Sequence, residues 1–422
     1  MHRVLAFSLA FVAAGGSLAA QARGTPSSPA CAPGNAGLTL PAGFCALMVA
    51  DSAGPTRHVT VTPNGDLFVA LSGSQGGVLA LRDTTGDGVA DVRRTFGPGG
   101  GSGIALQGGF LYFATNDAVV RWPWQAGQLE PQGPADTVVS QLLNRRQHAA
   151  KTIAVGTDGA LYVNIGAPSN SCGNPDRQPG ARGADPCTLL DSAGGIWRFD
   201  TGRLRQTQRD GERFSTGLRN VVALSADHAS GRLYGAQHGR DGLHQFWPAL
   251  FDSVQGAEKP AEELFLLERG GDYGWPYCYF DPELKQKVLS PEYGGDGRTA
   301  GRCANVRKPL VAFPGHWAPN GLLIYQGTQF PEKYRGGAFL AFHGSWNRAP
   351  LPQGGYNVTF APFAAGTAVG TWEVFADGFA EGNRDPQTAP HRPTGLAQGP
   401  DGSLYVTDDR GGRIYRILYR GP

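Results

Sequence analysis

The stretch Gly399-Pro-Asp-Gly-Ser-Leu-Tyr-Val-Thr-Asp408 decides the fold, because its pattern recurs along the chain. Each copy begins with an Asx-Gly or Gly-Gly turn, or a longer version of it, which favours a hairpin. A strand of alternating aromatic and β-branched residues follows the turn. The six copies occupy residues 62–71, 106–115, 156–165, 226–236, 334–343 and 399–408. Such internal similarity indicates one supersecondary unit used repeatedly.

Six turn-and-strand units predict an all-β fold, a six-bladed β-propeller. The alternative is a two-sheet sandwich followed by a second β domain, but recurrence up to the last residues favours the propeller. No Pro/Ser-rich linker divides residues 23–422, so we expect a single propeller domain there. Insertions at 167–191 and 240–303 separate some copies. Long ordered loops of this kind are usually functional, and we expect them on the active-site face.

The composition excludes several classes of protein. Glycine accounts for 63 of 422 residues, about twice the average share, and there are 31 prolines. Both residues disfavour helices, so the protein cannot be mainly helical. The net charge is only +2, and no basic run with interleaved aromatic residues occurs. We therefore expect no nucleic-acid partner.

The first 22 residues have the features of a secretory signal peptide. Arg3 supplies a positive charge, residues 4–14 are apolar, and small residues lead to a cleavage site at Ala22. The apolar run is shorter than the roughly 20 residues that span a bilayer. No other stretch could cross one, so we expect no membrane span. These features predict a periplasmic or secreted protein.

The six cysteines all lie beyond the signal peptide, which suits an oxidising compartment. Six cysteines allow 15 connectivities, and the sequence alone cannot choose among them. Pairing of sequence neighbours is the simplest scheme. It joins Cys31 to Cys45, Cys172 to Cys187, and Cys278 to Cys303.

Histidine, arginine and asparagine recur at the ends of the predicted blade strands. The segments are 145–148, 217–220, 237–241, 316–321, 343–348 and 391–395. Recurrence at equivalent blade edges predicts one convergent polar pocket. Arginines there suit a polyanionic ligand, because guanidinium groups match carboxylates in a bidentate manner. A neutral histidine suits general-base catalysis.

Several of these segments resemble the soluble quinoprotein glucose dehydrogenases. The shared features are His148 before a strand, Gly217-Leu-Arg219-Asn220, a His-Gly pair at 238–239, and Asp272-Tyr-Gly-Trp-Pro276. The segments at 316–321 and 343–348 look closer to the L-sorbosone and pyranose dehydrogenases. The resemblance covers nearly all of residues 45–419. It implies a six-bladed propeller that binds pyrroloquinoline quinone and Ca²⁺ at the mouth of the channel.

The resemblance also implies roles for individual residues. His148 would be the general base, and Arg219 would stabilise developing negative charge, with Asn220 against the quinone oxygens of the cofactor. Backbone carbonyls of Gly239 and Arg240 would contribute to the calcium site. Further cofactor contacts would come from the side chains of Arg57, His238, His343, Arg348 and Arg392.

The predicted function is that of an exported sugar dehydrogenase, of the aldose or sorbosone type. Its partners would be a small sugar and an external electron acceptor, a quinone or a cytochrome, since no C-x-x-C-H haem motif occurs. The alternative is a non-redox propeller that binds carbohydrate or protein, or a calcium-dependent lactonase. A lactonase should offer acidic metal ligands at the channel, whereas the blade edges offer mainly histidine and arginine.

Overall fold

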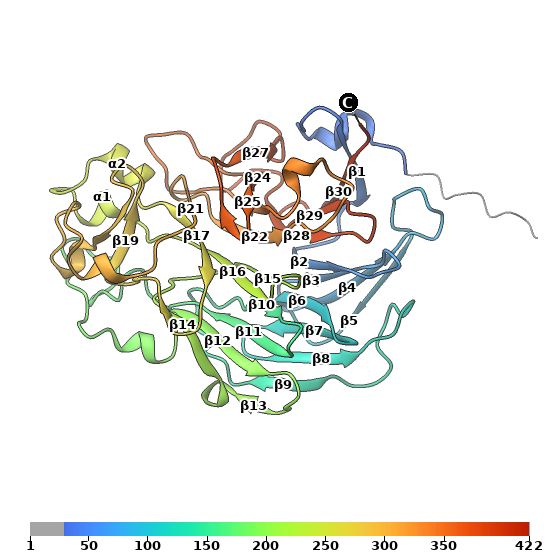
Figure 1. Ribbon diagram of the computed structural model, residues 1–422, viewed down its shortest axis with the longest axis horizontal. Coiled ribbons are helices and arrows are strands. Elements are labelled where there is room, and N and C mark those ends of the chain that lie inside the picture. The colour runs from blue at the N-terminus through green and yellow to red at the C-terminus, as the bar shows by residue number, and fades with distance from the viewer. Residues whose placement is uncertain (1–28, 422) are drawn as a thin grey trace, which may run out of the picture.

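Six β-sheets are arranged in a ring in the computed structural model, which describes residues 29–421 (Figure 1). The first strands of the six sheets line a central channel. The first strand of each sheet lies innermost, and the later strands follow outward in antiparallel order. The first three sheets consist of β2 (Thr56–Val61), β3 (Leu67–Leu71), β4 (Gly77–Arg82) and β5 (Val92–Phe96); β6 (Gly101–Gln107), β7 (Phe110–Thr115), β8 (Val119–Pro123) and β9 (Asp136–Ser140); and β10 (Ile153–Val155), β11 (Ala160–Ile165), β12 (Gly195–Asp200) and β14 (Glu212–Thr216).

The remaining three blades have the same order. They consist of β15 (Ala223–Asp227), β16 (Arg232–Gln237), β17 (Glu262–Leu267) and β21 (Val311–Phe313); β22 (Pro319–Ile324), β23 (Ala338–Phe342), β24 (Asn357–Ala361) and β27 (Glu373–Ala376); and β28 (Pro393–Gln398), β29 (Leu404–Asp408), β30 (Ile414–Tyr419) and β1 (Phe44–Ala50). Two short strands add to sheets in parallel, β13 (Gln206–Thr207) beside β9 and β18 (Gly271–Asp272) beside β14.

The repeated pattern corresponds to the second strand of every blade. Its six copies contain the strands β3, β7, β11, β16, β23 and β29. In the first copy Gly65 has φ of 90°, a left-handed conformation that glycine adopts without strain. The six-bladed propeller predicted from the repeats is therefore confirmed, and the sandwich alternative is wrong.

The N-terminal strand closes the ring. Strand β1 pairs with the C-terminal strand β30, with Phe44 opposite Tyr419. This pairing completes the sixth blade from both ends of the described chain and covers an edge that would otherwise be open to other strands.

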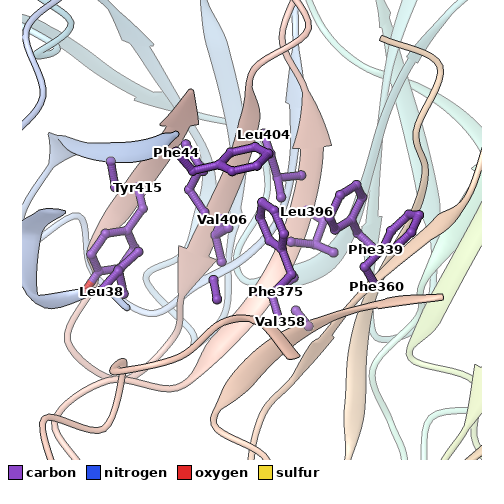
Figure 2. Packing of buried hydrophobic residues seen from close by; sticks show 14 of the residues in the cluster. Leu38, Phe44, Phe339, Val358, Phe360, Phe375, Leu396, Leu404, Val406 and Tyr415 are labelled. Carbon is purple, nitrogen blue, oxygen red and sulfur yellow. The ribbon is translucent and has the colours of Figure 1, made fainter. Parts of the chain in front are cut away.

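The hydrophobic core lies between neighbouring blades. Figure 2 shows one such cluster, in which aromatic side chains of the fifth and sixth blades pack together with Phe44 of β1. The ring of Phe44 meets that of Phe375 edge to face at 5.0 Å between centroids. It meets Phe330 in the same manner at 4.8 Å. Such geometry adds about 0.5–1.5 kcal/mol per pair to area burial, and here it holds the closing strand.

The long insertions form a lobe beside the fourth blade. It contains α1 (Leu243–Phe246), α2 (Ser253–Glu258) and the hairpin of β19 (Cys278–Asp281) and β20 (Gln286–Leu289), at the left of Figure 1. A small hairpin of β25 (Phe363–Ala364) and β26 (Thr367–Ala368) leaves the fifth blade. The short 3-10 helices are Pro33–Gly37, Thr188–Asp191, Gln208–Asp210, Pro291–Tyr293, Gly301–Asn305 and Glu332–Tyr334.

All three predicted disulfides are present, joining Cys31 to Cys45, Cys172 to Cys187, and Cys278 to Cys303. The disulfide between Cys172 and Cys187 closes a loop within the insertion of the third blade. The disulfide between Cys278 and Cys303 closes a loop within the lobe. Within residues 29–421 no helix has the length and apolar character needed to cross a bilayer. The predicted signal peptide, residues 1–22, lies outside the described residues.

Candidate active site

Strand ends from several blades meet at one mouth of the channel. Neighbouring strands run antiparallel, so the start of each first strand lies beside the end of the second strand of its blade. His148 precedes β10, Arg219 precedes β15, and His238 and Gly239 follow β16. These four residues line one cavity of about 220 Å³. Its wall also contains Gln147, Arg177, Asp241, Glu262, His316, Ala318, Trp346 and Asn347.

The ring of His148 is held in one orientation. Its Nδ1 lies 2.5 Å from the carbonyl oxygen of Ala167. A carbonyl only accepts, so Nδ1 carries the hydrogen, and in the neutral imidazole Nε2 carries the lone pair. No hydrogen bond to Nε2 comes from within residues 29–421. Burial and the charge of Arg219 hold the pKa of His148 well below 6.5, so the ring is a neutral base at pH 7.

Arg219 is buried and firmly held. Its Nη2 donates to Asp241 at 2.9 Å and to the side-chain oxygen of Asn170 at 3.1 Å. Its Nη1 donates to the carbonyl of Gly239 at 2.9 Å, and its Nε to the carbonyl of Asn170 at 3.2 Å. Because all three nitrogens are bound, the guanidinium has little freedom to move.

Positively charged side chains surround Asp241. Its Oδ2 lies 2.9 Å from Nη2 of both Arg219 and Arg177, and its Oδ1 accepts from Asn347 at 3.1 Å. Burial opposes ionisation of Asp241, but the charges of Arg219, His316 and Arg177 outweigh it and hold its pKa well below the usual range. The carboxylate is therefore charged at pH 7.

The other residues around the fourth blade are also hydrogen-bonded. The Nε2 of His238 lies 3.1 Å from the carbonyl of Pro319 and from the side-chain oxygen of Asn320. Burial and Arg219 lower its pKa to about 4. Asn220 accepts from Asn164 at 3.0 Å, next to the cavity wall.

Glu262 is a buried carboxyl in the cavity wall. It accepts from the backbone N–H of Gly239 at 2.7 Å and of Ala318 at 3.2 Å. Burial raises its pKa to about 8. Arg240 points instead into the lobe, where its guanidinium forms a buried ion pair with Glu292.

A second group of predicted residues gathers around Asp409, after β29. The Nη1 of Arg57 and the Nε2 of His343 lie 2.6 and 2.8 Å from its two oxygens. Arg392 donates to the carbonyls of His343 at 2.9 Å and Gly344 at 2.6 Å. Burial lowers the pKa of His343. Asn320 connects the two groups, since its side-chain oxygen lies 3.1 Å from Nε2 of His238 and its carbonyl 2.9 Å from Nε2 of His58, the residue after Arg57.

Arg348 follows Asn347 of the cavity wall, but its guanidinium is bound elsewhere. Its Nη1 donates to the carbonyls of Ala257 at 2.9 Å and Gly315 at 2.8 Å, and the side chain is buried. It ties the loop after β23 to the end of α2, and it is not among the residues that line the cavity.

The cavity wall suits an acidic ligand rich in oxygen. The Nε2 of Gln147 and the Oδ1 of Asn347 are buried without a hydrogen-bond partner in the described part of the chain. Leaving such groups unpaired costs about 1–3 kcal/mol each, so a ligand that pairs them gains affinity. Arg177, whose side chain is 34% exposed, can still turn a guanidinium edge to a carboxylate. This set of groups fits pyrroloquinoline quinone, a quinone with three carboxylates.

Curated proteins with a similar sequence include the pyrroloquinoline quinone-dependent pyranose dehydrogenase of Coprinopsis cinerea. It is 25% identical over 435 residues, which cover 92% of this chain and 53% of that protein. An uncharacterised protein of Borreliella burgdorferi is 30% identical over 206 residues, 48% of each chain. The chain thus spans about half the length of the curated relatives it matches.

Solved structures share the fold. The holo pyranose dehydrogenase PQQ domain from Coprinopsis cinerea superposes with a TM-score of 0.73 at 20% identity, covering 90% of this chain and 97% of that one. The calcium structure of the Trichoderma reesei family AA12 enzyme has a TM-score of 0.74 at 19% identity, covering 91% and 97%. The sequence model of the TrAA12-like family matches residues 38–420 of this chain. With nearly the whole propeller inside that match, the chain belongs to the TrAA12-like family.

Proposed function

We propose that this protein is a pyrroloquinoline quinone-dependent sugar dehydrogenase that passes electrons to an external acceptor. The observation that carries the proposal is that one cavity contains both the fixed guanidinium of Arg219 and His148, a neutral base whose Nε2 has no hydrogen-bond partner among the described residues. The named relative from Coprinopsis cinerea, a pyranose dehydrogenase, supports the cofactor and the substrate class.

Side chains of the cavity wall would hold the cofactor. Arg177 and Arg219 would face its carboxylates and quinone oxygens, while Gln147 and Asn347 would supply a donor and an acceptor. Asn220, His238 and the group formed by Arg57, His343 and Arg392 extend this surface around the mouth. When bound, the quinone supplies a two-electron acceptor for the hydride of the sugar.

His148 would act on the substrate hydroxyl. A sugar hydroxyl is a weak acid, so transfer of the hydride from the carbon that bears it requires a base that removes the hydroxyl proton. The bond from Nδ1 to the Ala167 carbonyl fixes the ring, so that Nε2 would accept this proton, and it would stabilise the imidazolium that forms. Arg219 would stabilise negative charge that develops on the acceptor side.

Calcium would be held by backbone carbonyls in this proposal. No group of three His, Cys, Asp or Glu side chains able to hold a metal ion occurs in the part of the chain described. The carbonyl of Gly239 already accepts from Arg219 at 2.9 Å and retains one lone pair. We propose that this oxygen and the carbonyl of Arg240 contribute to a calcium site that includes oxygens of the cofactor.

Binding of the quinone should raise the thermal stability of the protein. A ligand present at 100 times its Kd stabilises the native state by about 2.7 kcal/mol. The measurement is thermal unfolding of apo-protein with quinone plus Ca²⁺, with Ca²⁺ alone, and with quinone plus a chelator. Stabilisation by quinone only when Ca²⁺ is present supports both ligands. If no combination moves the transition while a sugar alone does, the protein is a carbohydrate-binding module and the proposal fails.

Trp346 should be a platform for the sugar ring. Its side chain is 61% exposed at the cavity wall, although Ser345 beside it is buried and Asn347 is bound to Asp241. An indole held between fixed neighbours and left in solvent suits stacking on the apolar face of a pyranose. We expect Trp346→Ala to raise KM about tenfold, or roughly 1.4 kcal/mol, with little change in kcat.

Trp346→Phe is the matched control for this platform, because phenylalanine keeps an aromatic face and should keep most of the affinity. Steady-state kinetics over a panel of sugars gives the result. An equal loss in both variants, or a fall in kcat at unchanged KM, would show that the indole does not contact the sugar.

A further inference from the structure

A single buried asparagine connects the third and fourth blades at the site. Asn170 lies in the insertion between β11 and β12 and is fully buried. Its side-chain oxygen accepts from Nη2 of Arg219 at 3.1 Å and from the backbone N–H of Asp241 at 2.8 Å. Its side-chain amide donates to the carbonyl of Asp241 at 3.0 Å. One side chain thus binds both members of the Arg219–Asp241 ion pair.

The backbone of Asn170 adds to this connection. Its carbonyl accepts from Nε of Arg219 at 3.2 Å and from the indole N–H of Trp275 at 2.9 Å. The guanidinium of Arg219 therefore finds two of its four acceptors on one residue of another blade. A buried arginine keeps a defined position only when such partners are themselves fixed.

The insertion keeps Asn170 in place. Its backbone N–H donates to Asp176 at 3.1 Å, and Ser169 donates to the same carboxylate at 2.8 Å. Two residues further on, Cys172 is joined by a disulfide to Cys187. Asn170 therefore has anchors within its own disulfide-closed loop in addition to its bonds to Arg219.

We propose that Asn170 is a positioning residue, which holds the guanidinium of Arg219 at the place from which it acts on His148. The effect of Asn170 on turnover rests on the proposed dehydrogenase activity. Its effect on the proton affinity of His148 does not, because that affinity can be measured in the protein without cofactor or substrate.

The charges facing His148 predict the direction of this effect. Beyond burial, the charges of Arg219 and His238 disfavour the imidazolium, and that of Asp241 favours it, with Arg219 the strongest of the three. Arg177, Glu262 and His316 line the same cavity. Freeing the guanidinium should therefore raise the pKa of His148 toward the ordinary value of about 6.5.

The experiment is an NMR titration of histidine-labelled apo-protein. The signal of His148 is the one missing from His148→Ala. In Asn170→Ala, and to a smaller extent in Asn170→Ser, the midpoint of this signal should move upward. Gln206→Ala is the matched control, since Gln206 is also a buried amide with several hydrogen bonds but lies between the second and third blades. It should leave the midpoint unchanged.

A double variant separates positioning from general loosening of the fold. If Asn170 acts through Arg219, Arg219→Ala should raise the His148 midpoint by itself, and adding Asn170→Ala should move it no further. An unchanged midpoint in both Asn170 variants, or a further equal rise in the double variant, overturns the proposal. If the midpoints behave as expected but no sugar is oxidised, the positioning role stands and the proposed dehydrogenase activity fails.

Discussion

Turnover of any sugar that the protein oxidises should fall by a factor of about 10²–10⁴ when His148 is replaced by alanine. The ring lines the cavity with Nδ1 bound to a carbonyl, and its Nε2 lone pair has no hydrogen-bond partner within the described residues. Cofactor affinity should change little, because the carboxylates of the quinone would be bound by guanidinium groups. A loss of turnover at unchanged cofactor affinity therefore distinguishes the base from residues that bind the cofactor. Stopped-flow reduction of bound quinone measures the rate of the chemical step directly.

The same reaction should persist to unusually low pH. Because the pKa of His148 lies well below 6.5 in the folded protein, the ring remains unprotonated in mildly acidic solution. The acidic limb of the kcat/KM profile should therefore lie below pH 6.5 and disappear in His148→Ala.

His228→Ala serves as the control for this substitution. His228 follows β15 at the opposite end of the channel and contacts the carbonyl of Val155 at 3.0 Å, so its loss should leave turnover intact. Wild-type turnover in His148→Ala would show that another group is the base. His238, the next histidine in the cavity, would then be tested in the same way.

The fold could be predicted from the sequence because each blade repeats one local signal. The turn around Gly65 and the strand that follows need no distant contact to be recognised. The disulfides followed for a similar reason, since short loops such as that between Cys172 and Cys187 close more readily than long ones.

The site could be predicted only in part. His148 and Arg219 were recognisable because they stand at strand ends, and strand ends of a propeller converge. Asp241 is the last residue of the predicted segment 237–241, but nothing local shows that its carboxylate turns back to Arg219. Asn170 and Trp346 come from loops, whose paths depend on packing across blades.

Arg348 shows the opposite limit. It stands in a segment that resembles the family, yet its guanidinium donates to backbone carbonyls of a neighbouring loop. A residue in a matching segment therefore has a predictable position along the fold. The direction of its side chain depends on hydrogen-bond acceptors elsewhere in the chain and is not predictable from the segment.

Stability should depend strongly on a buried ion pair beneath the site. Lys287 of β20 lies 2.6 Å from Glu263 of β17, and both side chains are almost fully buried. Gln237 donates to Glu263 at 2.9 Å and accepts from the backbone N–H of Arg219 at 2.9 Å. The pair thus joins the lobe to the blade that carries Arg219.

Lys287→Met should lower the free energy of unfolding by about 3–5 kcal/mol, because it leaves a buried carboxylate without its cation. Lys333→Met is the matched control, since Lys333 makes an ion pair with Glu373 of nearly the same length, 2.9 Å, but both partners are about half exposed. Exposed pairs contribute only about 0–1 kcal/mol. Urea unfolding of the two variants at pH 7 measures the difference.

The pH dependence of the stability loss in Lys287→Met shows whether the loss comes from the unpaired charge or from poor packing. Burial raises the pKa of Glu263 above its unfolded value, and loss of Lys287 raises it further. The folded variant then binds a proton more tightly than the unfolded chain, so lowering the pH through the folded pKa should return stability relative to the wild type. Adding Glu263→Gln to Lys287→Met should recover part of the loss at pH 7. A deficit that is equal at pH 5 and pH 8, and unaffected by Glu263→Gln, would mean that methionine simply packs poorly between β17 and β20.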